Sequence, residues 1–169
     1  MLDFLFRRLT TDVGGAPLFA AVTAEARRPH WYVEGEVPDT LDGRFAVLAT
    51  IAALTLVRLE RDGREGDLVS VALTERFIHA MDTEHRQLGL GDPTLGRKVR
   101  KLVGSLSRRV DLWRTTTAGE GEWTTATDQS LYKGAGSTEA RIHSADSLRE
   151  LWARLERSPV EQLAEGRIG

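Results

Sequence analysis

The chain has 169 residues, of which 41% are hydrophobic, so it is long enough to form one domain with a buried core. Its formal net charge of −2 argues against a dedicated nucleic-acid-binding protein, because such domains are usually strongly basic. The absence of cysteine excludes disulfides, thiol nucleophiles and thiolate metal sites.

The N-terminal part of the chain predicts two helices. Residues 1–10 form an amphipathic segment, which we expect to pack on the core because it is short and holds only two basic residues. Its charges follow its apolar residues, the reverse of a secretory signal. A second helix is expected over residues 16–28, because Pro29 disfavours helical geometry in the residue before it. We therefore divide the chain into an N-terminal segment, 1–14, and one helical domain, 15–169.

An extended connection and a central helix are predicted next. Residues 29–38 are expected to be extended, and the helix begins at Asp39 or Thr40, either of which can act as N-cap. Residues 45–59 are apolar on nearly every side, as in the central helix of a bundle. The longest uncharged stretch of the chain is shorter than the about 20 apolar residues of a membrane span, so we expect a soluble protein.

A fourth helix is predicted over residues 67–88. Val71, Ile78 and Met81 are spaced for one face of this helix, which we expect to be buried. Gly89 is suited to follow the end of the helix, because glycine readily adopts the left-handed conformation common at that position.

The fifth predicted helix is the clearest amphipath in the chain. Asp92 is expected as its N-cap and Pro93 as its first residue. At about 100° per residue, its apolar side chains fall in one arc, namely Leu95, Val99, Leu102, Val103, Leu106, Val110 and Trp113. The basic side chains lie outside that arc, with Asp111 as the one acid among them: Arg97, Lys98, Arg100, Lys101, Arg108, Arg109 and Arg114.

The C-terminal third predicts shorter elements. Residues 115–127 are rich in threonine and glycine and predict a mobile loop, followed by a short helix over residues 123–133. Ser144 is expected to cap a helix over residues 145–157, and Pro159 begins a tail helix. No strand is predicted. The expected fold class is all-α, a single compact bundle of about six to seven helices.

The sequence offers little catalytic chemistry. His79 and His85 are about 240° apart around one helix and cannot share a metal ion, while His30 and His143 look isolated. The chain has neither a cysteine nor a G-x-S-x-G motif to supply a nucleophile. We therefore expect no enzyme, no metal and no cofactor.

Two segments are candidate binding surfaces. The basic side of the fifth helix can meet acidic lipid headgroups, RNA or an acidic protein patch, although most charge runs are only solvated helix faces. The other candidate is the aromatic sequence His30-Trp31-Tyr32. Tryptophan and tyrosine are frequent anchors at protein interfaces, and they equally often fill the seams between helices.

Several motifs occur in an order that is informative. Residues 37–45 read V-P-D-T-L-D-G-R-F, and residues 18–31 contain A-E-A-R-R-P. Three shorter motifs follow, M-D at 81–82, G-L-G-D at 89–92 and G-R-K-V at 96–99. Together they resemble the ubiquinol–cytochrome c chaperone family, whose signature is V-P-D-T-x-D-G-R-F. The resemblance covers residues 18–133, with weaker similarity at Leu131-Tyr132 and the closing G-R-I.

The chain also departs from the family pattern. Leu106-Ser107-Arg108-Arg109 stands where relatives often have F-Y-G-R, and Pro93 stands where an aliphatic residue is usual. His85 occupies a position where leucine is usual. These departures concern the surface of the fourth and fifth helices rather than the fold.

The resemblance implies an all-α, non-catalytic assembly chaperone for the cytochrome b subunit of the cytochrome bc1 complex. Its implied partners are nascent or unassembled cytochrome b and the exit region of the ribosome, with no DNA. The chain lacks a mitochondrial presequence, so we expect a bacterial, cytoplasmic member with peripheral contact at the cytoplasmic face of the inner membrane. The alternative is a helical quinone- or haem-binding protein or enzyme, in which haem would need an axial ligand such as His85 or His30.

The expected binding residues belong to two surfaces. We expect Trp31, Tyr32 and the 38–45 corner to form a groove for the client, with Asp39, Asp42 and Arg44 shaping that corner by capping and ion pairing. We expect the basic side of the fifth helix to contact the membrane or the client. The candidate partner-binding residues are Trp31, Tyr32, Asp39, Asp42, Arg44, Phe45, Arg97, Lys98, Lys101 and Arg108.

Overall fold

The computed structural model describes residues 15–89 and 91–169, and within these ranges the chain is helical without a strand. The α-helices are α2 (Gly15–Ala26), α3 (Leu41–Leu59), α4 (Gly63–Gln87), α5 (Asp92–Thr115), α6 (Trp123–Thr127), α7 (Thr138–Arg157) and α8 (Val160–Ala164). Single turns join them: η1 (Pro29–Trp31), η2 (Glu60–Asp62), η3 (Thr116–Glu120) and η4 (Asp128–Tyr132). The all-α prediction is confirmed, while the helix predicted for residues 1–10 lies outside the described residues.

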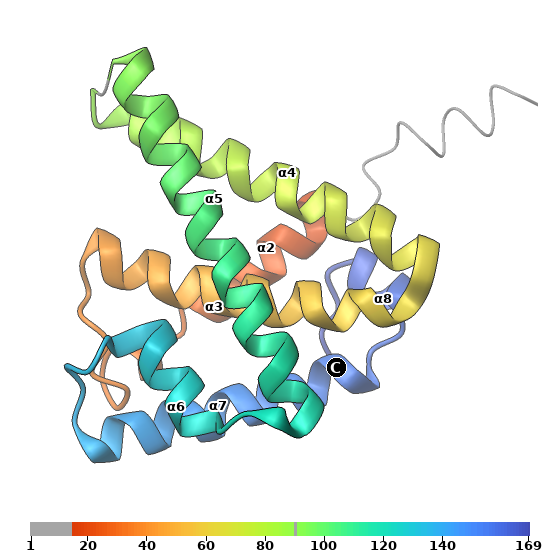
Figure 1. Cartoon of the computed structure of the whole chain (residues 1–169). Coiled ribbons are helices and arrows are strands. Elements are labelled where there is room, and N and C mark those ends of the chain that lie inside the picture. Colours follow the sequence, from red (N-terminus) through yellow and green to blue (C-terminus); the bar gives the residue numbers. More distant parts are fainter. Residues whose placement is uncertain (1–14, 90) are drawn as a thin grey trace, which may run out of the picture.

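Helix α3 runs through the middle of the molecule, and α5 crosses it while α2 and α7 pack against it (Figure 1). Every residue from 49 to 59 is buried, as predicted for a central helix. The helix begins after Thr40, whose Oγ1 accepts a hydrogen bond from the Gly43 N–H at 3.2 Å. Of the two predicted N-caps, Thr40 is therefore the correct one.

Arg58 is the buried cation of this central helix. Its Nε donates to the Leu155 carbonyl at 3.0 Å, its Nη2 donates to the Ser158 carbonyl at 2.9 Å, and its Nη1 pairs with Asp62. These carbonyls belong to the end of α7, where a helix leaves its last carbonyls without intrahelical partners. Arg58 thus fastens the end of α7 to the end of α3.

The predicted extended connection over residues 29–38 is wrong. The 3-10 turn η1 begins at Pro29. The Pro29 carbonyl accepts hydrogen bonds from the backbone N–H groups of Tyr32 and Val33, both at 3.0 Å. The chain then folds back on itself, because the Gly35 N–H donates to the His30 carbonyl at 2.8 Å. The hydrophobic effect explains the difference, because the compact turn places the Trp31 side chain in the core, where it is fully buried.

Helix α4 begins at Gly63 rather than at residue 67. Gly66 allows this early start, because a Cβ there would lie 1.9 Å from the Leu59 carbonyl oxygen. Val71 was predicted to be buried but is 58% exposed. The buried stripe runs instead through Val69, Leu73, Phe77 and Met81.

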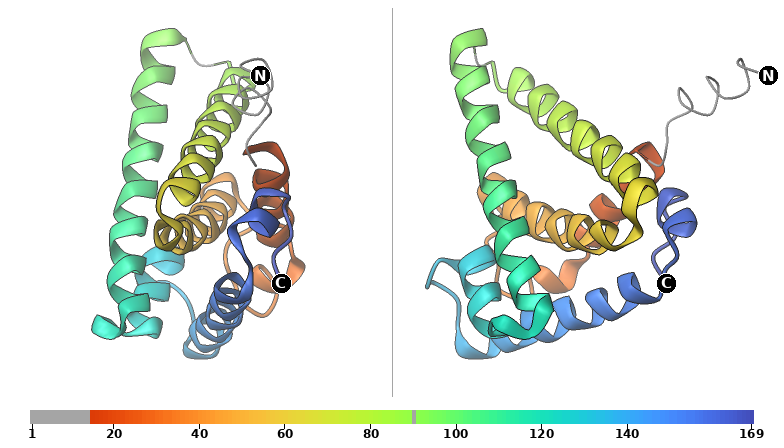
Figure 2. Two further views of the ribbon diagram at one scale, coloured as in Figure 1. Left: turned by 90° about the vertical axis from the view of Figure 1, so that its right-hand side faces the viewer. Right: turned by 45° about the vertical axis from the view of Figure 1, so that its right-hand side comes forward.

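Helices α3, α4 and α5 form the three sides of a triangle, in which the end of α4 approaches the beginning of α5 at the tip (Figure 2). Gly89 has a φ of +77°, so the predicted glycine end of α4 is confirmed. The N-cap of α5 is Gly91 and not Asp92, with Pro93 in the first turn. The predicted apolar arc of α5 is confirmed, since Leu95, Leu106 and Trp113 are buried and the valines are half-buried.

The C-terminal third contains two corrections. The predicted loop over 115–127 is mostly helical, since α5 continues directly into η3 and α6 follows. The ring centroids of Trp113 and Trp123 lie 5.3 Å apart, so these side chains pack across the bend between the two helices. The last long helix, α7, begins at Thr138 with Ser137 as its N-cap, rather than after Ser144.

Ser144 lies inside α7 and is buried. Its Oγ is 2.7 Å from the Tyr132 hydroxyl oxygen, whose single proton lies within hydrogen-bonding reach of the carbonyl oxygens of both Gly35 and Ala140. A long-range partner therefore explains why this serine is buried mid-helix rather than used as a cap. The predicted helix over 123–133, formed by α6 and η4, and the tail helix α8 are confirmed.

Candidate functional site

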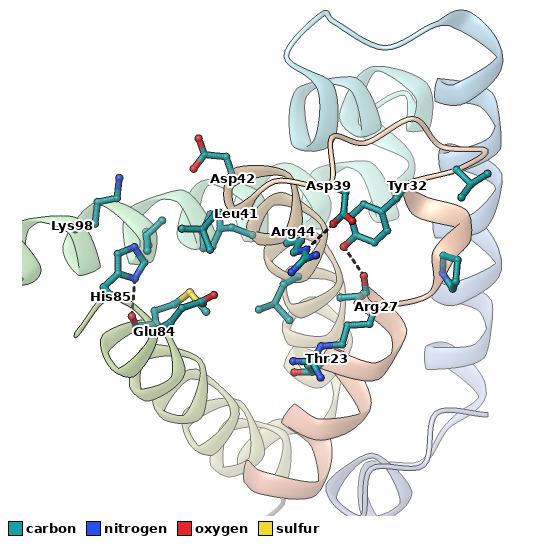
Figure 3. A pocket seen from close by; sticks show the side chains of 17 residues that line it. Thr23, Arg27, Tyr32, Asp39, Leu41, Asp42, Arg44, Glu84, His85 and Lys98 are labelled. Atoms are coloured by element: carbon teal, nitrogen blue, oxygen red, sulfur yellow. Dashed lines mark hydrogen bonds and ion pairs between the residues drawn. The ribbon is translucent and has the colours of Figure 1, made fainter. Parts of the chain in front are cut away.

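The structure has a groove of about 530 Å³ where α2, the 27–33 turn, the beginning of α3, the end of α4 and the beginning of α5 face one another (Figure 3). Its apolar wall is formed by Phe45, Leu48, Met81 and Leu102. Six of the ten predicted partner-binding residues line this groove: Tyr32, Asp39, Asp42, Arg44, Phe45 and Lys98. The structure therefore brings Lys98, from the basic side of α5, into the same groove as Tyr32 and the 38–45 corner, which the sequence analysis treated as a separate surface.

Residues 37–45 form a corner at one end of the groove, and four of them have a clear structural role. Val37 is buried in the core, and Thr40 caps α3. Gly43 is required by close packing, because a Cβ at this position would lie 1.8 Å from the Pro38 carbonyl oxygen. This tight corner delivers Phe45 to the groove wall, where its ring lies 6.0 Å from that of Phe77.

Asp39 and Arg44 form an ion pair on the rim of the groove. The Arg44 Nε donates to Asp39 Oδ1 at 2.6 Å, and both side chains are more than half exposed. This hydrogen bond lowers the pKa of the Asp39 carboxyl below its ordinary value. The predicted ion pairing at this corner is present, and it keeps the two charges on the rim.

Tyr32 lies beside this ion pair and belongs to the groove. Its hydroxyl donates to the Ala26 carbonyl at 2.8 Å, which ties the turn to the end of α2. Partial burial, and next the negative charge of Asp39, raise the pKa of the Tyr32 hydroxyl. Its neighbour Val33 is 68% exposed, so apolar surface continues from the groove onto the rim.

Trp31 does not line the groove. It is fully buried, and its indole N–H donates to the Glu25 carbonyl at 2.9 Å. A partner bound to this conformation cannot touch it. Its contribution to the site is to anchor the turn that carries Tyr32 and Val33.

His85 also lines the groove, and the sequence analysis did not predict this position for it. It comes from the last turn of α4, is only 4% exposed, and its Nδ1 lies 2.7 Å from the Met81 carbonyl oxygen. The sequence signal was its place on the same helical face as Met81, four residues earlier. In Figure 3, His85 and Lys98 lie at the end of the groove away from Arg27 and Tyr32.

The basic side of α5 is narrower than predicted. Arg109 is buried, with its Nη2 donating to the Ser130 carbonyl at 2.7 Å, and burial lowers its pKa to about 10. Arg114 is paired with Glu60 and Asp111 at the other end of the helix. The exposed cations outside the groove form what we call the α5 basic face, namely Arg97, Arg100, Lys101 and Arg108, and none has an ion-pair partner among the described residues.

His30 and His143 are not isolated, which corrects the prediction. His30 Nδ1 lies 3.0 Å from His143 Nε2, so η1 is hydrogen-bonded to α7. Burial, and next the charge of Arg28, lower the pKa of His30. Across residues 15–89 and 91–169, no three metal-ligating side chains converge, and no helix in these ranges is both long and apolar enough to cross a membrane.

Comparisons with known proteins agree with the resemblance found in the motifs. A family model described as "Ubiquinol-cytochrome C chaperone" matches residues 34–167. The fold is similar to the crystal structure of the Cbp3 homolog from Brucella abortus, with a TM-score of 0.82 and 22% identity over 99% of this chain and 95% of that chain. No protein of curated function matches the sequence.

Proposed function

The chain belongs to the ubiquinol-cytochrome C chaperone family, and we propose that it is a non-catalytic assembly factor that binds cytochrome b before this subunit joins the bc1 complex. The observation that carries the proposal is the groove. An apolar wall with charged residues on its rim suits a segment of an apolar client, because burial supplies affinity and the rim charges fix orientation. Exposed Val33 and Leu41 extend the apolar surface at its mouth.

The first test is to identify the client and the groove together. A photo-crosslinking residue at Leu41, on the groove, is expected to capture cytochrome b in cells that are assembling the complex. The same residue at Val71, which is exposed on α4 and does not line the groove, is the matched control. Capture of no bc1 subunit from Leu41, or equal capture from both positions, would contradict the proposal.

We further propose that the α5 basic face holds the protein at the anionic inner surface of the membrane into which cytochrome b is inserted. Each basic residue near such a surface contributes roughly 1 kcal/mol, so three residues together change binding by about a hundredfold. Arg97, Lys101 and Arg108 are exposed on one helix, and Lys98 connects this helix to the groove. Membrane contact and client binding would then use neighbouring surfaces.

Vesicle flotation tests this contact. The triple variant Arg97→Glu, Lys101→Glu, Arg108→Glu is expected to lose binding to vesicles that contain anionic lipid. Arg64→Glu, Arg149→Glu, Arg157→Glu changes the charge equally at exposed positions of α4 and α7 and should retain more binding. If the first variant still floats, the face is solvated surface only. Salt-sensitive binding to ribosomes that the first variant loses and the control variant retains would instead favour the ribosomal exit region as the partner of this face.

A further inference from the structure

The groove combines an apolar wall with a charged rim that holds both signs. Phe45, Leu48 and Leu102 are half-buried side chains of the wall. Exposed charged side chains surround the same space in Figure 3, three of each sign, namely Arg27, Arg44, Lys98, Asp39, Asp42 and Glu84. Arg44 and Asp39 pair with each other, whereas the other four have no ion-pair partner within residues 15–89 and 91–169. A ligand that covers these four charges must supply polar partners for them.

A membrane-spanning helix does not fit this groove. Such a helix is apolar on nearly every side over about 20 residues, so it would cover the unpaired rim charges without offering them partners. The groove volume of about 530 Å³ is that of a site for one small molecule. The groove therefore takes up a few side chains rather than a span of about 30 Å.

An extended peptide finds no backbone partners here either. Extended ligands usually bind by adding a strand to an exposed sheet edge. The groove lies instead between α2, α3, α4, α5 and the turn that follows α2, and no strand occurs among the described residues. The backbone groups of these helices are bonded within each helix, so an extended ligand would leave its own backbone groups unpaired against the apolar wall. A helical ligand satisfies its backbone internally and needs only side-chain contacts.

We propose that the groove recognises an amphipathic helix, with apolar side chains at positions i, i+3, i+4 and i+7 on one face and charges of both signs on its flanks. The apolar face packs on Phe45, Leu48 and Leu102, and the flanks meet the rim charges. In the client, such a helix lies at the membrane surface or outside the membrane, and the spanning helices stay free to insert. The inference rests on the proposed function only in taking cytochrome b as the source of the helix, because the recognised pattern is a property of the purified chain.

Fluorescence anisotropy titration of the full chain tests the pattern. The probe is a labelled synthetic helix with leucine at i, i+3, i+4 and i+7 and with lysine and glutamate elsewhere. Its control has the same composition, but its leucines are spread around the helix. We expect the probe to bind roughly tenfold more tightly or better, the effect of removing one leucine-sized side chain from the groove. Equal binding of the two peptides would overturn the inference.

The flanks and the groove are tested with matched changes. Probes whose flanks hold only lysine or only glutamate should bind several-fold more weakly, because three rim charges repel either one. Leu41→Ser at the mouth of the groove should weaken binding of the mixed-charge probe, whereas Val71→Ser, at an exposed position of α4 outside the groove, should not. Probe affinity that is the same in both variants would place binding elsewhere on the molecule and overturn the inference.

Mass spectrometry of the crosslink formed from Leu41 separates this inference from the proposed function. Capture of cytochrome b through a helix at the membrane surface or outside the membrane supports both. Capture through a spanning helix would overturn the inference and leave the assembly function standing. If the probe binds as expected and no cytochrome b is captured, the proposed function fails while the recognised pattern stands.

Discussion

Replacing Gly43 with alanine is expected to destabilise the corner that builds the groove. Gly43 lies in the first turn of α3, where alanine would ordinarily gain up to roughly 1 kcal/mol in helix propensity. Its Cβ, however, would lie 1.8 Å from the Pro38 oxygen and 2.9 Å from the Pro38 carbonyl carbon. These are backbone atoms of a neighbouring segment, so the corner must move. Such overpacking costs about 1–3 kcal/mol.

Urea unfolding measures the effect against a matched control. Gly96→Ala in α5 places its Cβ 3.6 Å from a flexible arginine terminus, an ordinary contact, so we expect it to raise the free energy of unfolding. Gly43→Ala should lower that free energy by up to roughly 2 kcal/mol, the overpacking cost of about 1–3 kcal/mol less the helical gain of about 1 kcal/mol. A Gly43→Ala variant as stable as Gly96→Ala would refute the packing argument.

The corner also positions Leu41 and Phe45, which gives the same substitution a second readout. Because both residues line the groove, a displaced corner should reduce crosslinking from Leu41 under conditions where the variant is fully folded. Gly96→Ala should leave crosslinking unchanged, since it does not line the groove. Unchanged crosslinking in a destabilised Gly43→Ala would mean that the corner supports the fold without shaping the binding site.

Three further predictions concern charge. Arg58→Met removes a buried guanidinium from two carbonyls and Asp62, so the free energy of unfolding in urea should fall by about 3 kcal/mol, whereas Arg61→Met at an exposed pair should cost less than about 1 kcal/mol. Because the pKa of His30 is lowered in the folded chain, the unfolded chain binds this proton more readily. The contribution of His30 to stability is therefore complete above about pH 6.5 and is lost as the pH falls below that value. In a His30→Gln variant, the free energy of unfolding should fall less steeply with decreasing pH on the acid side. Arg44→Gln should return the pKa of Asp39 toward its ordinary value in an NMR titration of the carboxyl groups, and an unchanged titration would show that the ion pair is absent in solution.

Local signals in the sequence predicted those features that depend on a few neighbouring residues. Pro29 and Gly89 end helices through their own backbone preferences, and Thr40 caps α3 within one turn. The prediction that Ser144 caps a helix was wrong because its side chain is hydrogen-bonded to Tyr132, a contact that no local sequence pattern indicates. The prediction for Val71 failed because apolar residues occur on two offset stripes of α4, and the packing of α4 against α2, α3 and α5 determines which stripe is buried.

The burial of Arg109 could have been predicted from its helical position, although its charge suggested an exposed residue. It lies three residues after Leu106 and four before Trp113, both of which are buried, so its position on the helix is inside the core-facing stripe. The long side chain reaches the Ser130 carbonyl at 2.7 Å and lies 5.8 Å from the Phe45 ring. A basic residue that lies three or four residues from buried apolar residues on the same helix should therefore be predicted as buried, despite its charge.

The position of Arg109 also bears on how the groove holds its shape. Phe45 has the groove on one side, and its ring contacts a buried cation on α5 and another aromatic ring on α4. Three helices thus fix one groove side chain, so the apolar wall is set by the core rather than by the exposed Asp39–Arg44 pair. Removing that pair should change how a ligand is oriented at the rim, whereas changing Phe45 should change whether an apolar ligand is held at all.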